Sequence, residues 1–199
     1  YALALAEFDF VRAHIEVIGE EDVPIVFQQS AVAKRRLGAI DDARVLADQA
    51  VDLARRTPEQ THLGDALETR GLLASQTGDH DRAIEALQEA FKAYKTLKSQ
   101  FDCARTFNNL AQSYFDARRC KAARRALGAA DRLAKELGAD AIRARARILL
   151  GEIEALEGNP SKASTLWRDA LEISRRTRDT VVHFKAEFQL FKLSIEQGN

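Results

Sequence analysis

The chain has 199 residues and carries 30 Lys plus Arg against 30 Asp plus Glu, so its formal net charge is zero. This balance argues against a nucleic-acid-binding domain, which uses a basic excess to neutralise phosphates. Hydrophobic residues make up 46% of the sequence, which excludes wholesale disorder, and no apolar run approaches the roughly 18 residues of a membrane span.

Three prolines against abundant alanine predict helices throughout the chain. The sequence has no methionine, even at position 1, which indicates a fragment of a longer protein.

The two cysteines, Cys103 and Cys120, are predicted to lie at opposite ends of a helical hairpin about 24 Å long. Because a disulfide needs Cα atoms within about 7 Å, we expect two unbridged thiols in a reducing, cytoplasmic compartment.

Four columns of mostly small residues recur along the chain with a period of 40 residues. The columns are Ala31, Gly71, Ala111 and Gly151; Gly38, Gly78, Arg118 and Gly158; Ala43, Ala83, Ala123 and Ala163; and Ala50, Ala90, Ala130 and Ala170. Small residues in register let helices approach closely, so the columns predict a repeated pair of packed helices. Stacked pairs bury apolar faces that one pair cannot bury alone.

The predicted elements follow this repeat along residues 1–199, which we expect to form a single array. A leading helix over 1–20 precedes four helix pairs over 22–57, 62–97, 102–137 and 140–177, and a last helix covers 181–197. In the second pair, Gly78 is predicted to end the first helix, and Asp79 or Asp81 to cap the next one. In the fourth pair, Asn159 is predicted as the cap and Pro160 as the first helical residue.

The last predicted helix differs from the first helices of the four pairs. Phe191 stands in the column that holds Ala31, Gly71, Ala111 and Gly151. A bulky side chain at that position blocks the approach of a following helix. We therefore predict a capping helix, with Phe184, Leu190 and Phe191 facing the fourth pair.

These units resemble tetratricopeptide repeats, whose signature combines large residues and a small one on the first helix with alanines on the second. The third pair carries the signature in Phe107, Leu110, Ala111, Tyr114, Ala123, Leu127 and Ala130. The resemblance implies an all-α fold, an α-solenoid in which antiparallel helix pairs form a right-handed superhelix. The 40-residue period is similar to the longer repeats of kinesin light chains and bacterial regulators.

In such a superhelix the first helices line a concave groove, which the resemblance implies as a peptide-binding surface. The predicted groove residues are Leu72 in the second pair; Arg105, Asn108, Asn109, Gln112 and Phe115 in the third; and Arg145 and Ile148 in the fourth. Asn109 best matches the asparagines of related peptide-binding repeats, since an amide both donates to and accepts from a peptide backbone. We expect Arg105 and Arg145 to pair with acidic residues of a ligand.

No catalytic residue, metal ligand or cofactor is predicted. The histidines His14, His62, His80 and His183 lie in different units, and none has metal-ligand spacing. No phosphate-binding glycine loop or nucleophile motif occurs, so an enzyme is not expected. The basic run from Arg118 to Arg132 is interpreted as a solvated helix face rather than a nucleic-acid site, and Trp167 as a core residue.

Two functions remain open. The first is a scaffold that captures a protein or peptide segment in the concave groove. The alternative is the sensory or regulatory domain of a larger protein, such as a bacterial transcriptional regulator or a signalling protein. Both rest on fold analogy, and neither identifies the ligand or the oligomeric state.

Overall fold

The computed structural model describes residues 19–58 and 60–196, and these residues form nine α-helices and no strand. The helices are α2 (Val23–Arg36), α3 (Ile40–Arg56), α4 (Leu63–Gln76), α5 (His80–Thr96), α6 (Gln100–Asp116), α7 (Cys120–Glu136), α8 (Asp140–Leu156), α9 (Pro160–Thr177) and α10 (Thr180–Glu196). The all-α prediction is confirmed for this part of the chain. Residues 1–18 of the predicted leading helix lie outside the described residues.

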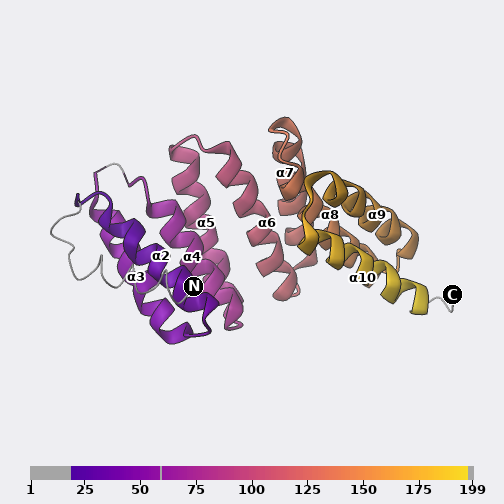
Figure 1. Ribbon diagram of the computed structural model, residues 1–199, viewed down its shortest axis with the longest axis horizontal. Coiled ribbons are helices and arrows are strands. Elements are labelled where there is room, and N and C mark those ends of the chain that lie inside the picture. The colour runs from indigo at the N-terminus through magenta and orange to yellow at the C-terminus, as the bar shows by residue number, and fades with distance from the viewer. Residues whose placement is uncertain (1–18, 59, 197–199) are drawn as a thin grey trace. The chain divides into compact units, whose positions relative to one another are not determined.

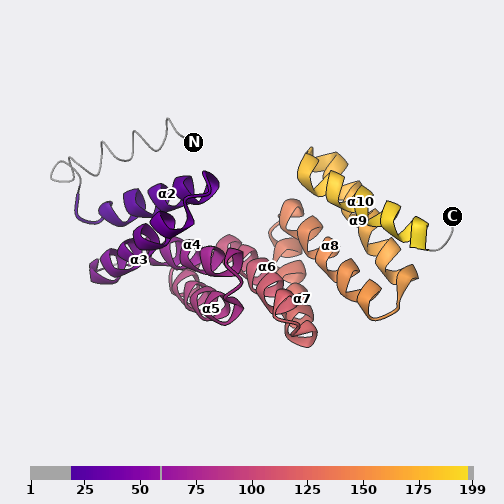
Figure 2. The same ribbon diagram turned by 90° about the horizontal axis from the view of Figure 1, so that it is seen from below.

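The chain divides into two compact units, with the boundary between Ser99 and Gln100. In the first unit α2 packs along α3, and α4 packs along α5 (Figure 1). In the second unit α6 packs along α7 and α8 along α9, while α10 packs on both α9 and α8 (Figure 2). In the structure α6 begins at Gln100, two residues before the predicted start of the third pair.

Local sequence explains the junction between α4 and α5. Gly78 follows α4 with a φ of 80°, which glycine adopts without the strain that a Cβ would cause. Asp79 then caps α5, because its Oδ1 accepts a hydrogen bond from the backbone N–H of Arg82 at 3.2 Å. Asn159 occupies the N-cap position of α9 and Pro160 is its first helical residue, as predicted. The Asn159 side chain makes no cap bond, however, and instead donates to Oε2 of Glu154 at 3.0 Å.

The two helices of a pair approach closely where the small columns meet. Gly151 of α8 lies against the indole of Trp167 on α9, and a Cβ added to this glycine would sit 2.7 Å from the indole Cδ1. The indole N–H donates to the carbonyl of Ile148 at 3.1 Å, and Trp167 is buried, as predicted. Ala123 and Ala163, from the facing column of second helices, are completely buried. These positions therefore set the spacing within each pair.

Both cysteines lie where the helix pattern predicts them. Cys103 is buried in the first turn of α6, and Cys120 is the first residue of α7. Neither forms a disulfide. The expectation of two unbridged thiols is confirmed.

The last helix, α10, packs on the fourth pair with a different face from the predicted one. Val182 and Ala186 are buried against α8 and α9. Leu190 packs against the cluster of Ala163, Trp167 and Leu193, as predicted. Phe184 and Phe191 are instead 68% and 63% exposed, so the prediction that they face the fourth pair is wrong. They lie on the side of the helix that, in earlier first helices, contacts the second helix of the same pair.

Replacing Gly151 with alanine is expected to lower the free energy of unfolding of the second unit by about 1–3 kcal/mol, because the new methyl group overpacks the contact with Trp167. The matched control is Gly128→Ala on α7, where an added Cβ meets no atom within 4 Å. This control should be neutral or stabilising by up to about 1 kcal/mol, since alanine is the better helix former. Urea unfolding followed by the fluorescence of Trp167, the only tryptophan in the sequence, measures both variants. Equal stability of the two variants would contradict the packing role of Gly151.

Candidate functional site

The first helices of the second unit, α6, α8 and α10, carry aligned polar side chains that form what is here called the first-helix face. The face comprises Arg105, Asn109, Gln112 and Asp116 on α6, Arg145 and Glu152 on α8, and Lys185, Gln189 and Lys192 on α10. Gln112, Glu152 and Lys192 share one column of the 40-residue period. Because stacked repeats superimpose such columns, these side chains lie on one side of successive first helices.

Glu152 is the acidic residue of this face that interacts with groups on both neighbouring first helices. Its Oε1 accepts a hydrogen bond from Nε2 of Gln189 at 3.0 Å, which joins α8 to α10. Burial raises the pKa of the Glu152 carboxyl above its ordinary value; the Gln189 hydrogen bond and the two lysines of α10 oppose this shift, and Asp116 on α6 adds to it. The carboxylate thus interacts with groups from all three first helices and is incompletely hydrated.

Each of the two arginines of the face pairs with an aspartate. Nη2 of Arg105 lies 3.0 Å from Oδ1 of Asp102, one turn earlier on α6. Arg145 is exposed, and its Nη2 lies 3.8 Å from Oδ2 of Asp179 in the turn before α10. An exposed ion pair such as that of Arg145 contributes about 0–1 kcal/mol, so a ligand carboxylate can compete for its guanidinium.

The predicted amides of α6 differ in their surroundings. Asn109 is half-buried, whereas Gln112 is exposed and donates from Nε2 to Oδ1 of Asp116 at 2.9 Å. Gln189 was absent from the predicted site, although it stands 40 and 80 residues after Leu149 and Asn109. The repeat column that contains Asn109 could therefore have identified Gln189 as a member of this face.

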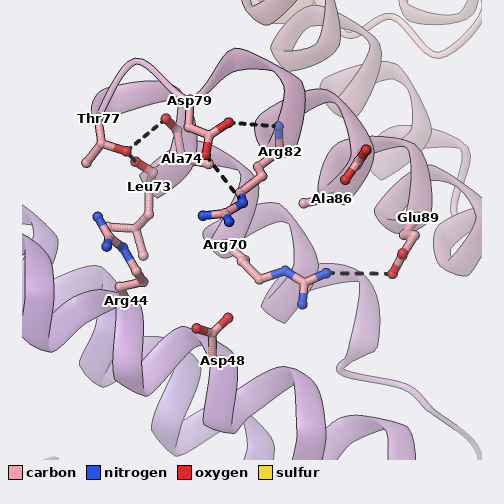
Figure 3. Close-up of a pocket in the computed structure, with 11 residues that line it drawn as sticks. Arg44, Asp48, Arg70, Leu73, Ala74, Thr77, Asp79, Arg82, Ala86 and Glu89 are labelled. Atoms are coloured by element: carbon pink, nitrogen blue, oxygen red, sulfur yellow. Dashed lines mark hydrogen bonds and ion pairs between the residues drawn. The ribbon is translucent and has the colours of Figure 1, made fainter.

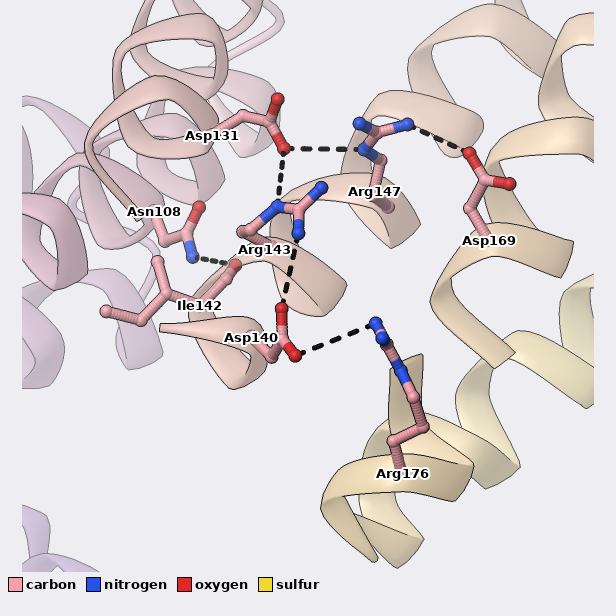
Figure 4. A network of polar contacts seen from close by, with 8 residues as sticks. All are labelled: Asn108, Asp131, Asp140, Ile142, Arg143, Arg147, Asp169 and Arg176. Carbon is pink, nitrogen blue, oxygen red and sulfur yellow. Dashed lines mark hydrogen bonds and ion pairs between the residues drawn. The ribbon is translucent and has the colours of Figure 1, made fainter. Parts of the chain in front are cut away.

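Asn108 and Ile148 belong to a different column from the first-helix face. Nδ2 of Asn108 donates to the carbonyl of Ile142 at 2.8 Å and so connects α6 to α8 (Figure 4). Ile148 is only 6% exposed and packs in the core between α8, α9 and α10, not on the surface where the sequence pattern placed it. Gln28 of the same column likewise donates to Oγ1 of Thr69 on the next first helix at 2.8 Å. This column joins successive pairs.

The two remaining predicted groove residues are apolar. Phe115 is half-buried near the end of α6. Leu72 is half-buried on α4 and belongs to the first unit. It is therefore not part of the first-helix face of the second unit.

An ion-pair network links the second helices α7 and α9 to α8 (Figure 4). Its members are Asp131, Asp140, Arg143, Arg147, Asp169 and Arg176. Arg147 contacts Asp169 at 2.9 Å and Asp131 at 3.4 Å, so that it bridges α9 and α7. Each arginine of the network has an aspartate partner, and the network holds the third and fourth pairs together without a surplus of either charge.

The first unit contains a hollow of about 560 Å³ between α3, α4 and α5 (Figure 3). Three arginines and four acidic residues line it, among other residues. Arg82 lies 3.4 Å from Asp79, and Arg70 lies 3.7 Å from Glu89. Since groups of both signs line the hollow in nearly equal number, it favours neither an anion nor a cation.

One row of polar groups in the second unit resembles a catalytic triad in composition. Oγ of Ser174 lies 3.1 Å from Nδ1 of His183, whose Nε2 lies 3.2 Å from Glu187. The hydroxyl of Ser174 is buried and donates to the carbonyl of Leu171 at 2.7 Å, so it is not presented to a substrate. The row connects α9 to α10.

Among the described residues no group of histidines, cysteines and acids could hold a metal ion, and no helix is long and apolar enough to cross a bilayer.

Stacked helix pairs with close small-residue contacts and a polar first-helix face define a helical-repeat protein of the solenoid class. Residues 22–96 match the family model described as tetratricopeptide repeat. The resemblance seen in the sequence is thereby confirmed over residues 22–96. No curated protein sequence matches the chain.

Solved structures show the same fold over both units. Aspartyl phosphate phosphatase F from Bacillus subtilis aligns with a TM-score of 0.80 at 16% identity, over 88% of this chain and 46% of that protein. The apo form of RapI aligns with a TM-score of 0.78 at 16% identity, over 92% and 51%. BtubC from P. vanneervenii aligns with a TM-score of 0.69 at 17% identity, over 99% and 88%. The chain thus spans about half the length of the first two proteins.

Replacing Glu152 with glutamine is expected to stabilise the protein at neutral pH. Burial raises the pKa of this carboxyl in the folded state, so the charged form opposes folding at pH values above the raised pKa. The gain should shrink as the pH falls from the raised pKa to the ordinary value of 4.5, and it should vanish below that value. Urea unfolding of both proteins between pH 4 and pH 8 measures the difference.

Glu154→Gln, two residues further on α8, is the matched comparison with the opposite sign. The hydrogen bond from Arg124 lowers the pKa of the Glu154 carboxyl, so its ionised form stabilises the fold. That stabilisation is present above the ordinary pKa of 4.5 and is lost as the pH falls through the lowered folded value. Glu154→Gln should therefore destabilise the protein at neutral pH. A Glu152→Gln variant that loses stability in the same way would contradict the account of Glu152.

Proposed function

We propose that this protein is a binding scaffold and that the first-helix face of the second unit captures a protein or peptide segment. The observation that carries the proposal is the incompletely hydrated carboxylate of Glu152, which lies among amides and charged groups from three helices. A poorly solvated carboxylate gains more from the N–H or cationic donors of a ligand than a fully hydrated one does. Side-chain groups that point the same way from α6 and α8 extend the contact along the face.

The remaining members of the face fit an extended ligand. Asn109 and Gln112 can each donate to and accept from a peptide backbone, which binds a segment independently of its side chains. Arg105 and Arg145 occupy one column on successive first helices and would pair with acidic side chains of the ligand. The exposed pair of Arg145 with Asp179 is exchanged at little cost.

The charges on the other side of the second unit favour this assignment. The arginines of the network in Figure 4 form ion pairs with aspartates, and these pairs hold neighbouring helices together. A ligand there would have to break a network that joins two pairs. A ligand on the first-helix face leaves that network intact.

The test is a screen of displayed random peptides against the whole chain, followed by fluorescence anisotropy with the selected peptides. The double variant Arg105→Ala, Asn109→Ala should weaken binding by about 1–3 kcal/mol, because the ligand loses hydrogen-bonding partners. Its matched control is Arg125→Ala, Arg132→Ala, which removes two exposed arginines from the second helix α7. Circular dichroism should show unchanged helicity in both.

If the first double variant binds the peptides as tightly as the wild type while the α7 variant loses them, the ligand binds the second-helix side and the proposal fails. If both variants retain full affinity, neither surface is the site and the proposal fails as well.

A second candidate function is the sensory or regulatory domain of a larger protein, such as a transcriptional regulator or a signalling protein. Its support is that the chain aligns with only about half of two longer proteins of the same fold. The natural gene tests it: a helix-turn-helix or nucleotide-binding domain encoded beside this segment would favour the regulator. We also propose a cytoplasmic location, supported by the two unbridged thiols.

A further inference from the structure

One face of α10 is an exposed apolar stripe. The stripe consists of Val181, Phe184, Phe188, Phe191 and Ile195, which are 54–68% exposed. The rings of Phe184 and Phe188 stack on each other with their centroids 6.3 Å apart. The opposite side of the same helix, with Val182 and Ala186, is buried on the fourth pair, beside which α10 lies in Figure 2. The stripe is therefore an apolar surface on an element that is already fixed in place.

The repeat columns show which partner this face has in the other first helices. Phe184 follows Gly64, Ala104 and Ala144, and Phe191 follows Gly71, Ala111 and Gly151, all of which are buried. At these positions the second helix of the same pair approaches closely: a Cβ on Gly64 would sit 2.6 Å from a ring carbon of Tyr94, and one on Gly71 would sit 2.8 Å from Cγ of Leu87. Two phenylalanines cannot be accommodated at that spacing. A second helix packed as in the other pairs is therefore excluded from this face.

The spacing of the stripe instead fits a wider helix–helix contact. Its residues follow one another at alternating intervals of three and four, which is the a/d pattern of a coiled coil in which large side chains interlock. The flanking positions are charged: Lys185 and Lys192 lie on one side, and Glu187 lies on the other. In a parallel pair of identical helices Glu187 faces Lys192 of the second copy, twice by symmetry. An antiparallel pair would place lysines opposite lysines.

We propose that α10 is a homodimerisation helix, which pairs in parallel with α10 of a second copy through the stripe. Burying the exposed parts of five large apolar side chains covers on the order of 500 Å² per copy. The total of about 1,000 Å² is where specific interfaces begin, so the dimer is weak and concentration-dependent. Because α10 is already folded against α8 and α9, association does not have to order a helix.

The charged flanks are available for this exchange. Nε2 of His183 lies 3.2 Å from Oε1 of Glu187, and Nζ of Lys192 lies 3.9 Å from Oε1 of Glu196. The Lys192–Glu196 pair is exposed, so it contributes little and re-forms readily with a new partner. In the other pair Glu187 is the exposed member, whereas His183 is half-buried beside Ser174.

Sedimentation equilibrium of the whole chain over a wide concentration range tests the proposal. The wild type should show a monomer–dimer equilibrium, and Phe188→Glu should weaken it at least about tenfold without loss of helicity, since this side chain is exposed. The matched control is Val45→Glu, which adds the same charge at an exposed apolar residue of α3 and should leave the dimer intact. A wild type that stays monomeric at all concentrations overturns the proposal, even if its stripe binds a helix of another protein. So does a Phe188→Glu variant that dimerises as the wild type does.

A charge exchange tests the parallel orientation. Glu187→Lys alone should weaken the dimer, because it places lysine opposite lysine. The double variant Glu187→Lys, Lys192→Glu should restore it by reversing both pairs. Failure of the double variant to restore the dimer overturns the parallel arrangement.

Discussion

The close approach of the two helices in each pair is the constraint on which the rest of this structure depends. Where Gly71 meets Leu87 and Gly151 meets Trp167, there is no room for even one further carbon atom. A larger residue would push the second helix outward, and the facing alanines such as Ala83 and Ala163 would lose their contacts. The volume of a few side chains therefore fixes the geometry of each pair, and stacking then repeats it within each unit.

The first-helix face follows from that repetition. Because successive pairs have the same spacing, residues 40 positions apart superimpose, and Gln112, Glu152 and Lys192 come to lie in one column. No single helix assembles this group. The environment of Glu152 is built by α6, α8 and α10 together, and its raised pKa reflects burial that only the stacked helices provide. The proposed binding surface is thus a consequence of the fold rather than a local motif.

The sequence predicted the fold well because small residues allow close helix contact whatever side chain lies opposite them. It predicted the site less well, because the role of a polar residue depends on what lies across from it. Asn108 and Asn109 are adjacent in sequence, yet Asn108 meets the carbonyl of Ile142 in the next first helix and is occupied in packing. Ile148 looks like a groove residue until α10 covers it.

The same limitation explains α10. A bulky residue in a small column is recognisable in the sequence, but the sequence does not tell whether that residue turns inward as a cap or outward toward solvent. Val182 and Ala186 occupy the contact with the fourth pair, and Phe184 and Phe191 are left on the outside. Which face a terminal helix presents is decided by competition between its two apolar sides, and that competition is resolved only in three dimensions.

A double-mutant cycle on Gly71 and Leu87 measures the central constraint most directly. The close approach predicts that Gly71→Ala is strongly destabilising beside Leu87, where the added methyl group would sit 2.8 Å from Cγ, but costs little once Leu87→Ala has made room for it. Urea unfolding followed by circular dichroism should therefore give a coupling free energy of about 1–3 kcal/mol, with the double variant more stable than the sum of the single changes implies. Strict additivity of the two substitutions would contradict the claim that the volume at this contact sets the spacing of the helices.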